Sequence, residues 1–231
     1  MNNLFSEIAK NAVFVLEFLG VVVAIFILAK IIEKWEKNRT GNKERILTTR
    51  KLTMVGMFSA IAAVLMIFEI PVPFAPAFYK LDFSEIPALI TGFAFGPVAG
   101  VMVEFCKIVL NLFMDSTTTA FVGELANFMV GCSFILPASI VYLYKKNRKS
   151  AIISCVVGTL CLTVFGTAFN AIYLLPKFAQ LYGMPLEAIV GMGTAINPAI
   201  TDVSTLVMFA VAPLNIIKGV SVSAITMLVY K

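Results

Sequence analysis

The sequence predicts an all-α integral membrane protein with a six-helix core and one additional transmembrane helix at its N-terminus. Three observations support this fold class. Of 231 residues, 60% are hydrophobic and only 13% are charged, with a mean hydropathy of +0.94. Several apolar runs are long enough to cross a bilayer, whose hydrocarbon core is about 30 Å thick. The basic residues gather between these runs, as is typical of a multi-pass membrane protein.

The first element is an apolar run over residues 12–32, and residues 1–32 are expected to form a separate transmembrane helix. It does not resemble a cleaved signal peptide, because no basic cluster precedes it and no A-x-A site follows. Residues 33–51 carry seven Lys/Arg and three acids, which indicates a basic cytoplasmic linker. The core domain, residues 52–231, has apolar runs over residues 52–70, 86–95, 98–113, 121–144, 151–175 and 213–230.

Two of the core runs, 86–95 and 98–113, are too short to span the bilayer as straight helices at about 1.5 Å per residue. Gly96-Pro97 separates them and predicts a tight turn. We therefore expect tilted or broken helices, whose freed backbone groups line a cavity. The loop 71–76 and the long stretch 176–212 are candidate lids.

The positive-inside rule gives an orientation. With residues 33–51 in the cytoplasm, the basic loop 145–149 (KKNRK) and Lys231 are cytoplasmic as well, and the N-terminus is outside the cell. This arrangement places 13 of the 18 basic residues on the cytoplasmic side. The opposite orientation would put both basic clusters outside.

Composition excludes several chemistries. The chain has no histidine, which removes the commonest general base and metal ligand. Its four cysteines lie singly in apolar runs, as expected of small buried side chains. Nucleotide-binding and nucleophile-elbow motifs do not occur. We therefore expect a protein that is not an enzyme, holds no metal or cofactor and binds no nucleic acid.

Ionisable and amide side chains in an apolar chain mark candidate sites. The outer half of the predicted bundle contains most of them: Glu69, Lys80, Asp82, Glu85, Asp115, Glu124, Asn127, Asn170, Asn215 and Lys218. Asparagine amides both donate and accept hydrogen bonds, which suits the mixed edge of a uracil-like or pterin-like ring. The alternative is that Asn170 and Asn215 only hold helices together. Glu104 and Lys107, spaced i,i+3 in the inner half, are expected to form a structural ion pair.

Four segments carry a family resemblance: KLDFSEIPALITGFAFGPVAGVMVEFCK (80–107), VGELANFMVG (122–131), FNAIYLLP (169–176) and APLNIIKG (212–219). They resemble the riboflavin-specific substrate-binding subunit, or S component, of energy-coupling factor (ECF) vitamin transporters. The resemblance implies capture of riboflavin from outside the cell. It also implies a transmembrane coupling subunit and two cytosolic ATPase subunits as partners, with riboflavin as transported ligand and no cofactor.

By the same resemblance, Asn170, Asn215 and Lys218 bind the flavin, and the first outer loop, with Tyr79, Lys80 and Leu81, covers it. Docking on the coupling subunit is implied for small residues of the first core helix. Here these are Gly56, Ser59, Ala60 and Ala63, in two small-x-x-x-small pairs that favour close helix approach.

The N-terminal extension departs from the family pattern, and its helix is expected to be an anchor, a docking helix or a guard along one face of the bundle. Other functions remain open at this point. The ligand could be FMN, roseoflavin or a related heterocycle. The chain could also be an intramembrane flavoprotein, or an assembly protein whose polar groups serve helix packing alone.

Overall fold

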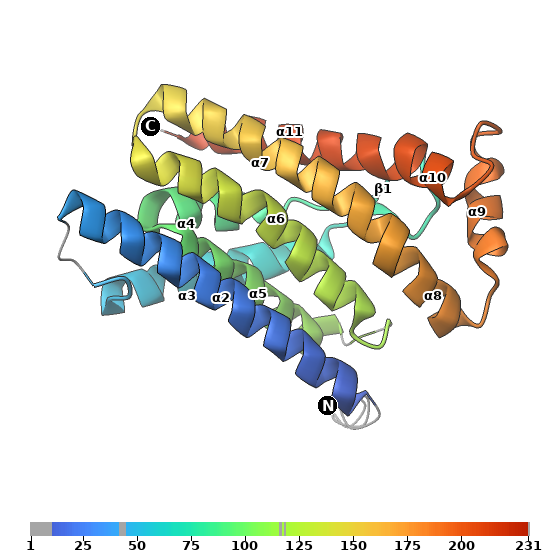
Figure 1. The fold of residues 1–231 in the computed structure, drawn as a ribbon, viewed down its shortest axis with the longest axis horizontal. Coiled ribbons are helices and arrows are strands. Elements are labelled where there is room, and N and C mark those ends of the chain that lie inside the picture. The colour runs from blue at the N-terminus through green and yellow to red at the C-terminus, as the bar shows by residue number, and fades with distance from the viewer. Residues whose placement is uncertain (1–10, 42–44, 116, 118, 231) are drawn as a thin grey trace.

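The structure is a computed structural model, and it describes residues 11–41, 45–115, 117 and 119–230. It is an elongated bundle of helices (Figure 1). The long helices are α2 (Ala12–Thr40), α3 (Thr49–Ile67), α5 (Pro97–Asp115), α6 (Val122–Tyr144), α7 (Arg148–Phe169) and α11 (Ala212–Val229). The shorter ones are α4 (Glu85–Phe95), α8 (Leu175–Tyr182), α9 (Leu186–Thr194) and α10 (Val203–Leu206). Two π-helical segments, η1 (Asn170–Leu174) and η2 (Val207–Val211), complete the list.

The predicted all-α membrane fold is confirmed. Within the described residues, six helical stretches are long and apolar enough to span a membrane, and α4 is a shorter apolar helix. Each predicted core run coincides with a helix to within a few residues, including the two short ones on either side of Gly96-Pro97. The last two spans are longer than predicted, because α7 continues through η1 into α8 and α10 continues through η2 into α11.

The expected boundary at residue 32 between helix and linker is wrong. Helix α2 continues through the charged residues 33–40 and ends at Gly41, which has the left-handed backbone (φ 68°) that stops many helices. Of the expected linker, α3 already contains residues 49–51. Residues 42–44 of that linker, and residues 1–10 of the N-terminal segment, lie outside the described residues.

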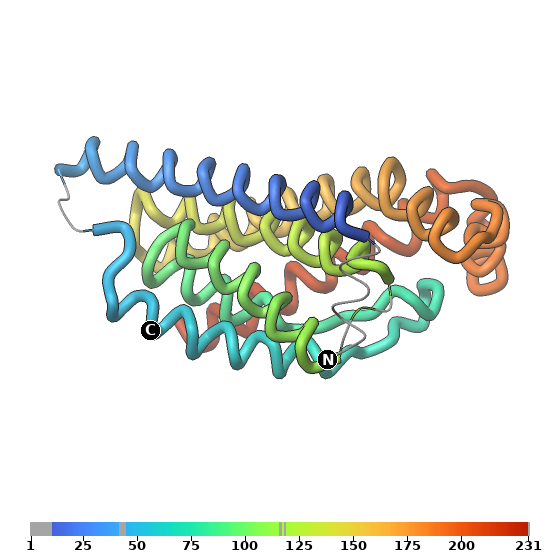
Figure 2. Tube along the Cα trace, turned by 90° about the horizontal axis from the view of Figure 1, so that it is seen from below, coloured from blue at the N-terminus to red at the C-terminus, as the bar shows by residue number. Residues whose placement is uncertain are grey.

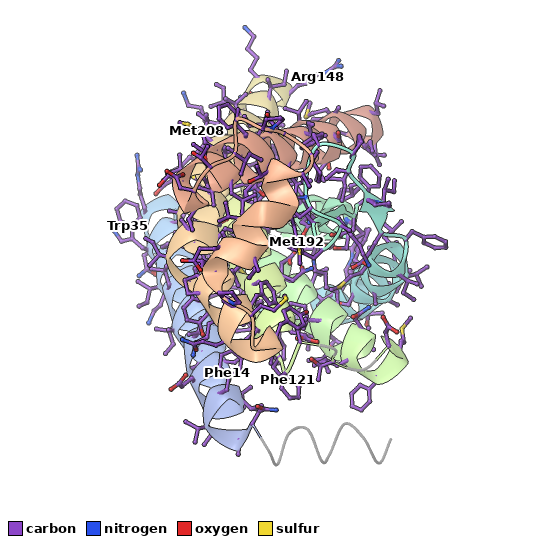
Figure 3. The ribbon with its side chains drawn as sticks, turned by 90° about the vertical axis from the view of Figure 1, so that its right-hand side faces the viewer. Phe14, Trp35, Phe121, Arg148, Met192 and Met208 are labelled. Carbon is purple, nitrogen blue, oxygen red and sulfur yellow. The ribbon has the colours of Figure 1, made fainter. Side chains whose placement is uncertain are left out.

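The two ends of the bundle differ (Figure 1). One end, at the left, has the end of α2, the turn between α6 and α7 and the last turn of α11. The other end has α8 and α9. Figure 3 looks at this end and shows α9, the orange helix that carries the labelled Met192, lying across the end of the bundle. We call these the cytoplasmic end and the outer end, after the predicted orientation.

Helices α2 and α3 lie on opposite sides of the bundle, with α5 packed against both (Figure 2). The main apolar core joins α3, α4, α6, α7 and α11 around Leu89, Phe134 and Leu162. A second cluster places Phe18, Val22 and Ala29 of α2 against α5 and α6. The N-terminal helix is therefore packed as part of the bundle along its length.

Candidate functional site

The outer end is closed by the two segments that the sequence suggested as lids. The first contains a minimal antiparallel hairpin of β1 (Ile70–Pro71) and β2 (Lys80–Leu81). Its Ala75 belongs to one apolar cluster with Ile189, Ile200 and Leu206 of the second segment. The two lids therefore pack against each other through one apolar cluster.

Beneath these lids, the two predicted asparagines meet at one glycine. Asn170 is the first residue of η1, and its Nδ2 donates to the Gly166 carbonyl oxygen at 2.8 Å. The Asn170 Oδ1 accepts a hydrogen bond from the Tyr79 hydroxyl at 2.9 Å. Burial raises the pKa of Tyr79, so its hydroxyl remains a neutral donor. The first lid is thereby tied to α7 through an amide at the start of a π-helical segment, a feature that often marks functional sites.

Asn215 lies against the same glycine from α11. A Cβ atom on Gly166 would lie 2.6 Å from Asn215 Nδ2, so only glycine leaves room for this amide. Asn215 is 5% exposed, and its Nδ2 has no hydrogen-bond partner among the described residues. A buried amide donor that nothing satisfies costs about 1–3 kcal/mol. The site thus presents one amide that is already satisfied and one that can donate to a ligand.

Near the amides, four buried charged side chains and the largely buried Lys218 form a continuous chain of ion pairs. Lys218 Nζ lies 2.9 Å from carboxylate oxygens of both Asp82 and Glu85. Lys107 Nζ lies 3.3 Å from Glu85 and 2.9 Å from Glu104. This chain of ion pairs, which we call the charge chain, therefore runs from Asp82, beside the first lid, to Glu104 in the middle of α5. Glu85 is the carboxylate that contacts both lysines.

Ser84 links the two halves of this chain. Its hydroxyl accepts a hydrogen bond from Lys107 at 2.8 Å and donates to Asp82, and its backbone N–H donates to the same Asp82 oxygen at 2.9 Å. The segment between β2 and α4 is consequently fixed to α5 and α11 by charged hydrogen bonds, which are stronger than neutral ones.

Comparison with known proteins identifies the family. A family model described as "ECF transporter, substrate-specific component" matches residues 50–230. The chain is 36% identical to a protein of Staphylococcus aureus named "Riboflavin transporter RibU", over 79% of this chain and 89% of the relative. The chain belongs to the family of ECF transporter substrate-specific components.

Two further matches agree with this. A Bacillus subtilis protein named "Riboflavin transporter FmnP" is 31% identical, over 80% of this chain and 92% of the relative. A solved structure titled "Structure and mechanism of the S component of a bacterial ECF transporter" matches with a TM-score of 0.61 and 35% identity, over 78% of this chain and 93% of that one. The suspected family is therefore confirmed.

Some predicted site residues of this substrate-specific component lie apart from the amides and the charge chain. Lys80 pairs with Glu69 on the exposed hairpin, whereas Leu81 beside it is buried. Glu124 accepts a hydrogen bond from Thr119 at 3.1 Å in the first turn of α6. Asn127, one turn further, is half-buried, and its Oδ1 has no hydrogen-bond partner in the part of the chain that the structure describes.

The expectation for Glu104 and Lys107 needs a correction. The two do form an ion pair, as predicted, but they are not a separate unit in the inner half of the bundle. Lys107 also contacts Glu85 and Ser84, so the pair is continuous with the residues beneath the lid. Sequence spacing could not reveal this, because the contacts join residues more than 20 positions apart.

The four small residues of α3 separate into two groups. Gly56 and Ala60 are exposed, whereas Ser59 and Ala63 are 1% and 2% exposed and face the bundle. Ser59 and Ala63 are packed inside the bundle and do not fit the predicted docking role, whereas docking through Gly56 and Ala60 stays a prediction. The physical reason is the helical period: positions i and i+4 share a face, but adjacent positions point about 100° apart.

Two site residues, Gly166 and Ser84, were not predicted from the sequence. Gly166 leaves room for the Asn215 amide and accepts a hydrogen bond from Asn170 through its carbonyl oxygen. The Ser84 hydroxyl accepts a hydrogen bond from Lys107 and donates one to Asp82. The only sequence signal for Gly166 was its position four residues before Asn170, which puts both on one face of α7.

Proposed function

We propose that this substrate-specific component binds riboflavin at its outer end and captures it from outside the cell. Two of its relatives are named riboflavin transporters, and a buried site with amide groups lies beneath two apolar lids. The flavin ring system combines a flat apolar body with a uracil-like edge of donors and acceptors. Apolar walls suit the first part, and asparagine amides suit the second.

The observation that carries the proposal is that Asn215 Nδ2 has no hydrogen-bond partner among the residues that the structure describes. A buried donor is destabilising unless a partner satisfies it. A carbonyl oxygen of the flavin edge would accept from this amide, so a bound flavin would supply the partner that the described residues do not. Asn170 differs, since its amide already bonds to Gly166 and Tyr79.

The charge chain favours riboflavin over FMN. A phosphate group needs cationic partners, and Lys218 is already neutralised by Asp82 and Glu85 at 2.9 Å. Lys80, on the first lid, pairs with Glu69. Binding the FMN phosphate to Lys218 or Lys80 would require breaking one of these pairs, so we expect its affinity to be lower. In this proposal, Lys218 acts by holding Asp82 and the lid in place.

Release of the ligand into the cell would need the partners that the family name implies. We propose a transmembrane coupling subunit and two cytosolic ATPase subunits, with ATP hydrolysed by those subunits. The exposed small residues Gly56 and Ala60 support α3 as the helix that contacts the coupling subunit, since short side chains allow close helix approach.

We also propose that the N-terminus lies outside and the C-terminus in the cytoplasm. The bundle supports this by collecting the basic end of α2 and the loop 145–149 at one end. A cysteine in place of the exposed Gln180 should react with a membrane-impermeant thiol reagent added to intact cells, and one in place of Lys146 should not. The reverse pattern would contradict the orientation, and the unsubstituted protein measures labelling of the four native cysteines.

Riboflavin titration of purified, ligand-free protein tests the binding proposal, with quenching of flavin fluorescence as the signal. We expect a Kd in the nanomolar range, or roughly −12 kcal/mol. Asn215→Ala and Asn170→Ala should each weaken binding by about 1–3 kcal/mol. No quenching at micromolar riboflavin would refute the proposal.

Asn147→Ala is a matched control. Asn147 accepts from the Ser150 N–H at 2.8 Å and caps α7 at the cytoplasmic end. Its replacement should lower stability by about 1 kcal/mol and leave the Kd unchanged. If the two site variants lose stability but bind riboflavin with the wild-type Kd, the asparagines serve helix packing instead.

A further inference from the structure

The buried charge chain carries an imbalance of charge. It contains three carboxylates, Asp82, Glu85 and Glu104, and two ammonium groups, Lys107 and Lys218. All but Lys218 are less than 9% exposed, and Glu104 and Lys107 are fully buried. With every group ionised, the chain would hold one uncompensated negative charge at membrane depth. Such a charge is costly, so one carboxyl group is expected to hold a proton.

The hydrogen bonds identify which carboxyl group this is. Asp82 accepts from Ser84 twice and from Lys218, so its negative charge is well satisfied. Glu85 receives both lysines on one oxygen. Glu104 has one close cation, Lys107, whose Nζ lies 2.9 Å from Oε2, and no other described residue donates a hydrogen bond to either of its carboxylate oxygens. Glu104 is therefore the least stabilised anion of the three.

The surroundings of Glu104 provide little else to stabilise a negative charge. From α6, it faces Gly131, where a Cβ atom would lie 2.2 Å from Glu104 Oε2, and the thiol of Cys132. The charged groups that act on it are Lys107 on its own helix, Glu85 from α4 and Lys218 from α11. One of these three is itself a carboxylate.

We propose that Glu104 is a proton-binding site, protonated at neutral pH, and that its proton controls how firmly the first lid is held. With Glu104 neutral, Lys107 is free to bond Glu85 and Ser84. With Glu104 ionised, Lys107 is drawn toward it, and the Ser84–Asp82–Lys218 bonds beneath the lid weaken. The proton would thus be linked to the ligand site through Lys107 and Ser84.

Infrared spectroscopy tests the proton directly, without any ligand. The full-length protein at neutral pH should show the C=O stretch of a protonated carboxylic acid, and Glu104→Gln should remove it. Glu104→Gln keeps the group neutral and should unfold within a few degrees of the wild type. Glu85→Gln, which removes the carboxylate that both lysines share, should lower the unfolding temperature much more. An unchanged band in Glu104→Gln, or equal destabilisation by the two variants, would overturn the proposal.

If Glu104→Gln does not express, Glu104→Met can replace it, because methionine is also neutral and similar in length. The same infrared band should then be missing.

The link between the Glu104 proton and the first lid rests on the proposed riboflavin binding and has its own measurement. The wild-type Kd should rise severalfold as pH increases through the Glu104 titration, and the Kd of Glu104→Gln should stay constant. Equal pH dependence in both proteins would overturn the link. A protein that binds no riboflavin but shows the band would refute the proposed function and retain the proton site.

Discussion

Helices α2 and α3 flank the bundle on opposite sides and both pack against α5, yet they use their surfaces differently (Figure 2). Helix α2 buries Phe18, Val22 and Ala29 and exposes bulky side chains such as Leu16 and Ile27. Bulky apolar side chains suit contact with lipid. Helix α3 buries one face in the core and exposes the pair Gly56 and Ala60 on the other, beside bulky side chains such as Met57 and Ile61.

The helices also differ at the cytoplasmic end, where α2 has a polar attachment. Glu33 is 1% exposed and accepts the Val98 N–H at 3.3 Å, at the start of α5. A carboxylate at a helix N-terminus is stabilised by the unpaired N–H groups there. Gly96, with a φ of 103°, makes room for it, because a Cβ atom would lie 2.9 Å from Glu33 Oε2. Helix α2 therefore has a polar attachment to α5 in addition to its apolar contacts, and α3 is the helix whose exposed small residues are proposed to meet a partner.

The largest expected effect comes from a bulky side chain on the buried face of α3. Ala63→Trp places an indole where alanine is 2% exposed, and overpacking of this kind typically costs 1–3 kcal/mol or more. We expect a large drop in the unfolding temperature and loss of ligand binding along with the fold. A stable, ligand-binding Ala63→Trp protein would show that this face is not packed as described.

Ala60→Trp is the matched variant on the exposed face. It should change stability by less than about 0.5 kcal/mol and leave riboflavin binding intact, as expected of a surface position. Uptake into cells with the ATPase module should be abolished, because the indole prevents close approach of the coupling subunit. Normal uptake by Ala60→Trp would mean that the coupling subunit docks elsewhere.

A second pair of variants replaces glycine by alanine at two positions, one in the site and one on the exposed face of α3. Gly166→Ala puts a Cβ atom 2.6 Å from Asn215 Nδ2 and should weaken riboflavin binding by about 1–3 kcal/mol, because the amide must move. Gly56→Ala meets nothing within 4 Å and should stabilise α3 by up to about 1 kcal/mol. Fluorescence titration and thermal unfolding measure the two effects. Equal affinities in both variants would contradict the role of Gly166.

A third pair tests the polar attachment of α2. Glu33→Gln removes the charge at the start of α5 and should lower stability by about 1 kcal/mol, the usual size of a charge–helix interaction in a partly buried setting. Glu17→Gln, on the exposed side of the same helix, should have no measurable effect. Thermal unfolding distinguishes them. If both variants unfold like the wild type, the apolar contacts alone hold α2.

The residues explain which features could be predicted from the sequence. The helices were predictable because each apolar run between turn signals exceeds the length of an ordinary loop. The end of α2 was misplaced because charged residues 33–40 suggested a linker, although Gly41 preceded by Lys37 and Arg39 is an ordinary helix stop. Asn170 and Asn215 were predictable as amide side chains in an apolar chain, and the family resemblance implied the same two residues. Their meeting at Gly166, and the joining of Glu104 to Asp82, depend on contacts between distant helices.

The smallest expected effect is that of removing α2 on riboflavin binding. The family match begins at residue 50, and Asn170, Asn215, Lys218 and Tyr79 all lie beyond it. Deletion of residues 1–45 would expose Val101, Ile108 and Phe128, which α2 now covers, so stability should fall. The Kd for riboflavin should change less than twofold in the shortened protein, measured in detergent by fluorescence titration. A larger loss of affinity would place α2 within the binding function and remove the distinction between the two flanking helices.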